Sequence, residues 1–404
     1  MVAEKPEHKK EEIIEEEVEE TDEFIPQEPA LRLAEIRHLL SLDDTIVPAS
    51  EKATLRVEAT NICKKDNMSF LYKHTFGSDV DEELLKTMEE ENKTKLAALE
   101  QERVEGEAGT DFDLQEHNMK KAKYLVQIGD KASAFPLLEE CLSKAVGGTT
   151  RIDIANIALR LALAYDERKH WVSWTEKLST LVDKDGDWER RNRTAIYKAA
   201  MLMSRNQVKE ASALLVPGIP TYTCTELMSF DSMVTMTVLA ALVSLNRVDL
   251  RNKIINSSDV TQALLDQPVL KNFLYSYYEC KSEQFMKALV EMEPIILRNR
   301  YFAPHVSTYA RQATLVAMKQ YLTSFHSVTL AAMARAFGLT VESLESRLVE
   351  YIALGKLPAV INAVKGTVEV HSNDSKGVKY DNLVNIGDEV LSKATALAQR
   401  LTAL

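Results

Sequence analysis

The chain has 404 residues, of which 45% are apolar and 27% are charged, so most of it can bury a core. Glycine and proline are scarce, with 13 and 11 residues, which favours long helices over many short strands. No CxxC pair occurs among the four cysteines, which excludes a disulfide framework and a zinc ribbon and indicates a reducing compartment.

Residues 1–23 carry eleven acidic side chains and three lysines, so a net charge of −8 out of a total of −12 lies in this segment. We expect residues 1–28 to form a disordered acidic tail, because like charges repel and few apolar residues are available. The rest of the chain is mildly acidic, which argues against a partner bound through nucleic-acid phosphates. The longest uncharged run, at 232–246, is shorter than the roughly 20 residues that span a bilayer, and no signal core is found, so we expect an intracellular protein without a membrane partner.

Residues 29–113 are expected to be helical, beginning near Ala30. Asp79 to Glu105 is predicted to form one long, charged and largely exposed helix with a thin apolar face, which ends at Gly106 and Gly109. Residues 114–310 then repeat pairs of amphipathic helices joined by short polar turns, at Gly129-Asp130, Asn206-Gln207 and Leu245-Asn246. This pattern predicts a helical-repeat stem of the tetratricopeptide type, so the fold class is all-α.

Residues 311–371 are expected to include a winged helix, which is clearest from His326. Gly338 would end a first helix, and Thr340 would cap a second. A β-hairpin turning at Lys365-Gly366 would follow, so the order is helix, turn, helix, hairpin. Leu330, Met333, Ala334 and Phe337 share one face of the first helix, and the second helix is expected to bury Val341, Leu344, Leu348 and Ile352. The strand-like alternation of the hairpin is formed by Val360, Ile361, Val364, Val368 and Val370.

Winged helices often bind DNA, and the second helix would be the one that reads bases. Its charged residues are Glu342, Glu345, Arg347 and Glu350, which would set three carboxylates against the phosphates. We therefore expect a protein-packing module and no nucleic-acid partner.

Residues 381–404 are predicted to form a terminal helix after a polar loop at 371–380. Leu383, Val390, Leu397 and Leu404 recur every seven residues, and Ala394 and Leu401 fall four residues after two of them. This is a coiled-coil-like spacing. From the residues alone, such a helix either folds back on the body or packs with helices of other subunits.

Catalytic and cofactor motifs are missing from the sequence: there is no HExxH, GxxxxGK[ST], GxGxxG or GxSxG. We expect no enzyme activity, cofactor or metal. His305 is expected to be structural. In Gly186 to Arg193 we expect Asp187 to cap a helix, Trp188 to pack at its start and the arginines to make intramolecular contacts.

Several short phrases of the sequence are distinctive: Gly186 to Arg193 with Tyr197, Thr225 to Met228, Asp249 to Arg251, Phe302 to His305, Asp374 to Lys376 and Ile386 to Asp388. They resemble one family, the PCI-domain proteins of the regulatory subunit 6 type in the lid of the eukaryotic 26S proteasome. The resemblance covers nearly the whole chain after residue 29. The COP9 signalosome has a related PCI subunit, which is the alternative.

The resemblance implies a non-catalytic scaffold in the cytoplasm and nucleus that supports ubiquitin-dependent degradation. Its PCI domain would span about 205–371. Its partners would be other PCI lid subunits, joined through an exposed wing strand at Thr367 to Val370, and the lid deubiquitinase. The C-terminal helix would enter a bundle of subunit helices. The expected interface residues are Thr367, Val368, Glu369, Val370, Leu383, Ile386, Val390, Ala394, Leu397, Leu401 and Leu404.

Overall fold

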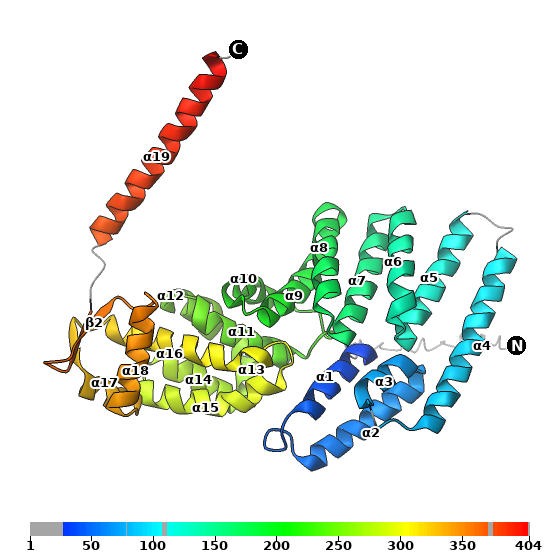
Figure 1. Ribbon diagram of the computed structural model, residues 1–404, viewed down its shortest axis with the longest axis horizontal. Coiled ribbons are helices and arrows are strands. Elements are labelled where there is room, and N and C mark those ends of the chain that lie inside the picture. Colours follow the sequence, from blue (N-terminus) through cyan, green and yellow to red (C-terminus); the bar gives the residue numbers. More distant parts are fainter. Residues whose placement is uncertain (1–26, 78, 107–110, 371–374, 403–404) are drawn as a thin grey trace, which may run out of the picture.

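The computed structural model describes residues 27–77, 79–106, 111–370 and 375–402. These residues form an elongated array of helices with a winged helix at one end and a long helix projecting from it (Figure 1). The acidic tail lies outside the described residues except for Gln27 and Glu28. These two were assigned to the tail, but they contact the folded body: the Gln27 amide donates to Glu35 and Leu227, and Glu28 pairs with Arg160.

The first three helices form a small unit beside the stem: α1 (Pro29–Ser41), α2 (Ala49–Asp66) and α3 (Ser69–Phe76). Helix α1 begins at a proline, which has no N–H to leave unpaired at this position. Its apolar residues are buried on more than one side, because α1 packs against α2, α3 and α7. It therefore belongs to the core of the N-terminal part.

The long charged helix is α4 (Glu82–Gly106), which ends at Gly106 as predicted. It packs on α3 and α5 through a narrow strip that includes Met88 and Asn92, and most of its described glutamates face solvent. The stem continues as antiparallel pairs: α5 (Asp111–Ile128) with α6 (Lys131–Lys144), α7 (Gly148–Tyr165) with α8 (Arg168–Asp185), and α9 (Trp188–Ser204) with α10 (Val208–Gly218).

Each of these pairs is joined by the same tight turn. Gly129, Asp166 and Asn206 have positive φ, and the N–H of the next residue bonds back to the carbonyl five residues earlier. This is the Schellman ending of a helix, which satisfies carbonyls that the helix leaves open. The predicted turns at 129–130 and 206–207 are thus confirmed. The third, at 245–246, is different: Leu245 is extended and Asn246 precedes α12.

The C-terminal part continues the array. Helix α11 (Phe230–Ser244) is buried all round, and α12 (Arg247–Leu250) passes into a π-turn at Arg251–Ile255. Next come α13 (Ser258–Asp266), α14 (Pro268–Tyr278), α15 (Ser282–Arg298), a 3₁₀ turn (Ala303–His305) and α16 (Val306–Leu322). The predicted boundary at residue 311 lies inside α16, so the winged helix is better counted from His326.

The winged helix comprises β1 (Ser327–Thr329), α17 (Leu330–Phe337), α18 (Val341–Ala353), β2 (Ala359–Asn362) and β3 (Thr367–Val370). The final helix, α19 (Ser375–Thr402), starts earlier than the expected residue 381, so most of the predicted loop is helical. Below, the N-terminal arm means residues 27–218, and the C-terminal arm means residues 230–370.

Candidate protein-interaction surfaces

The two helices of the winged helix form as the sequence predicts. Gly338 ends α17 with φ of +66°, and the Thr340 hydroxyl accepts from the Ser343 N–H at the start of α18. Thr329 caps α17 in the same way, which the sequence analysis did not identify. The buried residues Phe337, Leu344 and Leu348 hold the two helices together.

The prediction that Thr367 to Val370 forms an exposed wing strand is wrong. Thr367–Val370 is the central strand of a three-stranded sheet in the order β1-β3-β2, and it pairs antiparallel with both neighbours. The cause is the short segment after His326, which is extended and pairs with β3. Because the backbone of β3 is paired on both sides, it has no free edge. The edges belong to β1 and β2.

The outward side of the winged helix carries several exposed apolar side chains. Val360 on the β2 edge is 51% exposed, and Val364 at the wing tip is 98% exposed. Val349 on α18 and Leu354 just after this helix are also exposed. Val341 was expected to be buried, and this is wrong, because it is the first residue of α18 and faces solvent. Val364 was expected to belong to a strand, but it lies in the turn beyond β2.

Helix α19 extends away from the body (Figure 1). Leu383, Ile386, Val390 and Leu397 are between 61% and 70% exposed, and Ala394 is exposed as well. Leu401 lies within α19, but its side chain is outside the described residues, and so is Leu404. The described part of α19 thus does not fold back on the body.

The apolar residues of α19 cover a broad part of its surface. At 100° per residue, the side chains from Ile386 through Leu383 to Val384 span an arc of about 160°. Two small residues, Gly387 and Ala394, lie within this arc. A two-stranded coiled coil uses a narrower strip, so the width of this face suits contact with more than one helix.

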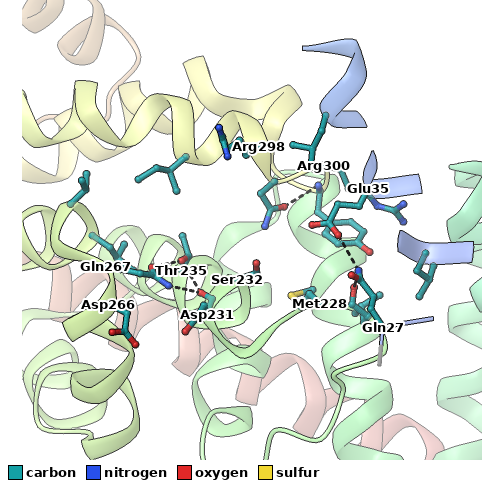
Figure 2. A pocket seen from close by; sticks show the side chains of 18 of the residues that line it. Gln27, Glu35, Met228, Asp231, Ser232, Thr235, Asp266, Gln267, Arg298 and Arg300 are labelled. Atoms are coloured by element: carbon teal, nitrogen blue, oxygen red, sulfur yellow. Dashed lines mark hydrogen bonds between the residues drawn. The ribbon is translucent and has the colours of Figure 1, made fainter. Parts of the chain in front are cut away.

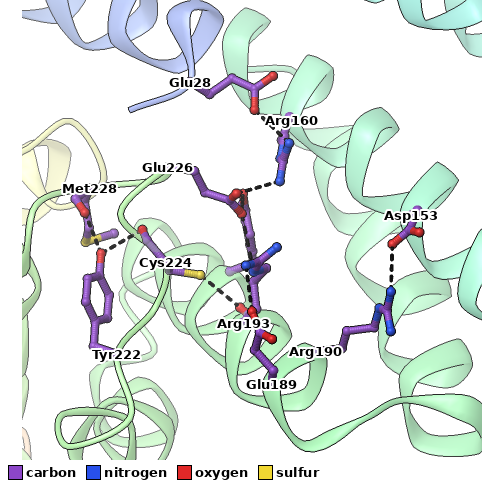
Figure 3. Close-up of polar contacts among 11 residues, drawn as sticks. Glu28, Asp153, Arg160, Glu189, Arg190, Arg193, Tyr222, Cys224, Glu226 and Met228 are labelled. Carbon is purple, nitrogen blue, oxygen red and sulfur yellow. Dashed lines mark hydrogen bonds and ion pairs between the residues drawn. The ribbon is translucent and has the colours of Figure 1, made fainter. Parts of the chain in front are cut away.

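A buried polar cluster joins the N-terminal segment to the middle of the stem (Figure 3). The Arg160 guanidinium of α7 donates to Glu28 at 2.8 Å and to Glu226 at 2.6 Å, and the Tyr197 hydroxyl donates to Glu226 at 2.8 Å. Burial raises the pKa of Glu28 above its ordinary value, although Arg160 opposes this. Arg193 lies 3.8 Å from Glu226.

The arginines of Gly186 to Arg193 are paired within the chain. Arg190 binds Asp187 at 2.7 Å and Asp153 at 3.5 Å, while Arg193 binds Glu189 at 3.1 Å. The expectation of intramolecular contacts is therefore confirmed for these two. Asp187 precedes α9 as predicted. Its carboxylate accepts from the Arg190 guanidinium, however, and from no backbone N–H of α9, so it does not cap the helix. Trp188 is 64% exposed, so it does not pack at the helix start.

A hollow of about 460 Å³ lies where the two arms meet (Figure 2). It is bordered by α1, by the first turns of α11 and α14, and by the segment after α15. Its walls mix carboxylates, such as Asp231 and Asp266, with Arg298, Arg300 and apolar side chains. No cluster of three potential metal ligands occurs among the described residues, and none of their helices is long and apolar enough to cross a membrane.

Comparison with known proteins adds evidence over almost the whole chain. A family model described as "26S proteasome subunit RPN7" matches residues 81–253, and one described as "PCI domain" matches residues 289–372. The "26S proteasome non-ATPase regulatory subunit 6 homolog" of Arabidopsis thaliana is 32% identical, over 92% of this chain and 97% of the plant protein. The chain belongs to the family of 26S proteasome non-ATPase regulatory subunit 6.

Other members of the subunit 6 family also align with most of this chain. The Caenorhabditis elegans protein is 29% identical, with 94% of this chain and 95% of the worm protein aligned. The "26S proteasome regulatory subunit RPN7" of Saccharomyces cerevisiae is 30% identical, over 78% of this chain and 74% of the yeast protein. These relatives are named as regulatory subunits.

Several of the residues that resemble the subunit 6 family lie near the junction of the arms, whereas Asp249 to Arg251 lies at α12 and Ile386 to Asp388 on α19. Arg193, Tyr197 and Glu226 meet in the polar cluster, and the His305 imidazole donates to the Ser204 carbonyl oxygen at 2.8 Å. Burial raises the pKa of the nearby Cys224 thiol to about 12, so it is no nucleophile at neutral pH. These contacts give the phrases a structural role.

Proposed function

We propose that this chain is a non-catalytic scaffold subunit of the 26S proteasome lid that holds sister PCI subunits and the lid deubiquitinase in place for ubiquitin-dependent degradation. The observation that carries the proposal is the exposed apolar face of α19, on a helix that projects from a folded body. Such a face in water is stabilised when it is covered by a partner. The membership of the chain in the subunit 6 family identifies the assembly in which that partner is sought.

The second surface of the scaffold is the sheet edge of the winged helix. We place it at β2, because β3 is paired on both sides and β2 has an open edge with Val360 exposed beside it. A neighbouring winged helix would add its own strand there, with backbone hydrogen bonds giving affinity. Thr367 to Val370 would then support the interface as the strand behind the edge.

The third element of the proposal is the multi-helix environment of α19. An apolar arc of about 160° is wider than a two-stranded seam covers, so at least two partner helices would pack on it. Gly387 and Ala394 would permit close approach of one of them. The interface positions are those named above: Leu383, Ile386, Val390, Ala394 and Leu397 on described side chains, with Leu401 and Leu404 beyond them.

Two other functions receive less support. The relatives described above carry the 26S proteasome name, which favours the proteasome over the COP9 signalosome. For nucleic acid, Glu342 and Glu350 on α18 are exposed and would face phosphates, with Arg347 only partly exposed. We therefore propose no nucleic-acid and no membrane partner, and residence in the cytoplasm and nucleus with the proteasome.

The test is a list of the chains that co-purify with a tagged copy, identified by mass spectrometry. Proteasomal ATPases and the lid deubiquitinase should be recovered in stoichiometric amounts. Recovery of cullin-deneddylating subunits in their place would support the signalosome instead. Retention of duplex DNA at physiological ionic strength would revive the nucleic-acid reading.

A further inference from the structure

One short segment of the C-terminal arm makes most of the polar contacts to the N-terminal arm. It consists of residues 297–305, from the last two residues of α15 to the residue before α16, and we call it the clasp. The Leu297 carbonyl oxygen accepts from His38 Nε2 of α1 at 2.8 Å. Arg298 donates to the Ile46 carbonyl oxygen at 3.0 Å and pairs with Glu51 of α2.

The same segment reaches three stem helices. Arg300 Nη2 donates to the Leu163 carbonyl oxygen in the last turn of α7 at 3.0 Å. Tyr301 packs beside Trp171 of α8, with ring centroids 6.0 Å apart. His305 binds the last residue of α9, Ser204. The two hydrogen bonds, from Arg300 and His305, end on carbonyls in the last turns of α7 and α9, where donors and positive charge are favoured.

The clasp is anchored in its own arm by aromatic packing. Phe302 is fully buried and meets Tyr309 of α16 edge-on, with ring centroids 5.1 Å apart. The Tyr309 hydroxyl donates to the Leu239 carbonyl oxygen of α11 at 3.1 Å. A displacement of the clasp therefore carries α11 and α16 with it, and with them the winged helix that follows.

The surroundings of the clasp are not tightly packed. Arg298, Arg300 and Tyr301 border the hollow of about 460 Å³, and the view in Figure 2 shows both arginines at its rim, next to α1. Two nitrogens of Arg300 are buried without a hydrogen-bond partner. Arg37 donates to the adjacent Ala164 carbonyl oxygen, so two cations meet at the end of α7. The arms are thus joined by the packing of α10 on α11 and, on the side of the clasp, by directed polar contacts beside open space.

We propose that residues 297–305 are the positioning element of this scaffold: they set the angle between the N-terminal arm and the winged helix, and so the placement of the β2 edge and α19. Arg300 and His305 are the residues that carry it. The proposal deepens the scaffold function, and its consequence for assembly rests on that function. The angle itself is a property of the isolated full-length chain and is tested without any partner.

The test is single-molecule energy transfer between dyes on the two arms of the full-length chain. One dye goes on Cys280, which is exposed on the C-terminal arm while Cys63, Cys141 and Cys224 are buried, and the other on an introduced S133C on α6. In Arg300→Ala with His305→Ala, the distribution of transfer efficiency should widen and its mean should shift, with the far-ultraviolet circular dichroism unchanged. Lys287→Ala is the matched control, because its exposed pair with Glu283 lies within α15 and joins nothing to the N-terminal arm, so the distribution should stay as it was.

A second variant keeps the test decisive. His305→Gln retains an N–H donor for the Ser204 carbonyl oxygen and should restore most of the narrow distribution lost in His305→Ala. An unchanged distribution in the double variant would overturn the proposal. Loss of helical signal in parallel with the change in distance would overturn it too, because the segment would then be needed for folding rather than for positioning.

Discussion

Arg160 and Glu226 are joined by a 2.6 Å ion pair that links α7 to the loop between α10 and α11. The same guanidinium holds Glu28 at 2.8 Å, so residues from three distant parts of the sequence share one cation. Only 10% of the Glu226 side chain and 20% of the Arg160 side chain are exposed. An ion in such a site is expensive to leave unpaired.

Arg160→Ala should destabilise the chain strongly, by about 3 kcal/mol, because it leaves two partly buried carboxylates without their partner. Equilibrium denaturation by urea measures the change. Arg190→Ala is the matched control, since its partners Asp187 and Asp153 are exposed and each such pair contributes about 1 kcal/mol or less. Equal effects of the two substitutions on the free energy of unfolding would show that the Arg160 cluster stabilises the chain no more than an exposed ion pair does.

Glu28→Gln should change the dependence of stability on pH. Burial raises the pKa of Glu28 in the folded chain, so the folded state binds a proton more tightly than the unfolded state. The stability that protonation of Glu28 contributes to the folded chain is therefore fully present below the unfolded-state pKa of about 4.3. It is lost as the pH rises through the raised pKa of the folded state. Thermal unfolding between pH 4 and 7 should show that the stability of the variant rises relative to that of the parent as the pH increases. An opposite trend would contradict the raised pKa of Glu28.

Cys280→Gly should stabilise the turn between α14 and α15. Cys280 has φ of +60°, a conformation that disfavours side chains by about 1–2 kcal/mol relative to glycine. The gain will be reduced by the loss of the contacts that its sulfur accepts from Gln320 and Arg247. A rise in the denaturation midpoint is expected, and a fall would mean that these contacts outweigh the backbone strain.

Gly129→Ala should be destabilising for two reasons that a control can separate. Gly129 has φ of +83°, and an added Cβ would lie 2.7 Å from Leu71 Cγ. Gly366 also has positive φ, but nothing lies within 4 Å of its Cβ position. Gly366→Ala should therefore show the backbone effect of about 1 kcal/mol alone, and Gly129→Ala should exceed it. Equal losses in denaturation experiments would exclude a packing role for the close approach to α3.

Val360→Lys should weaken binding of a neighbouring winged helix without affecting the fold. A lysine on an edge strand opposes strand addition, and Val360 is half exposed in the free chain. Binding is measured by pull-down of sister PCI subunits, and folding by thermal unfolding. Val364→Lys is the control, because this residue is in the wing turn, off the strand. If both variants bind like the parent, the β2 edge is not the contact.

The winged helix shows which features could be predicted from the sequence and which could not. The caps at Gly338 and Thr340 were predictable because local chemistry determines them. The strand at β1 was not, because Ser327–Thr329 is too short to show alternation and is extended only through its pairing with β3. Because β1 was not predicted, β3 was expected to be an edge strand, although it is the central strand of the sheet. Long-range pairing is what a local pattern does not contain.

The turns of the stem could be predicted from the local sequence, whereas the contacts of the clasp could not. Glycine and asparagine in the turns at Gly129 and Asn206 indicated tight joins, and the structure contains them. His305 was expected to be structural, but nothing in its neighbourhood identified Ser204, about a hundred residues earlier, as its partner. Likewise the spacing of Leu383, Val390 and Leu397 predicted an apolar face on α19. Whether it folds back or projects depends on the rest of the body, which the spacing does not describe.

The most direct test of the scaffold function is recovery of the assembled proteasome from cells in which a tagged chain with Val390→Asp and Leu397→Asp replaces the parent. Both side chains are exposed in the free chain, so thermal unfolding of the purified variant should match that of the parent. We predict that the variant folds but that proteasomal ATPases and the lid deubiquitinase no longer co-purify with it. Recovery of the complete regulatory complex with the variant in place would contradict the proposed role of α19.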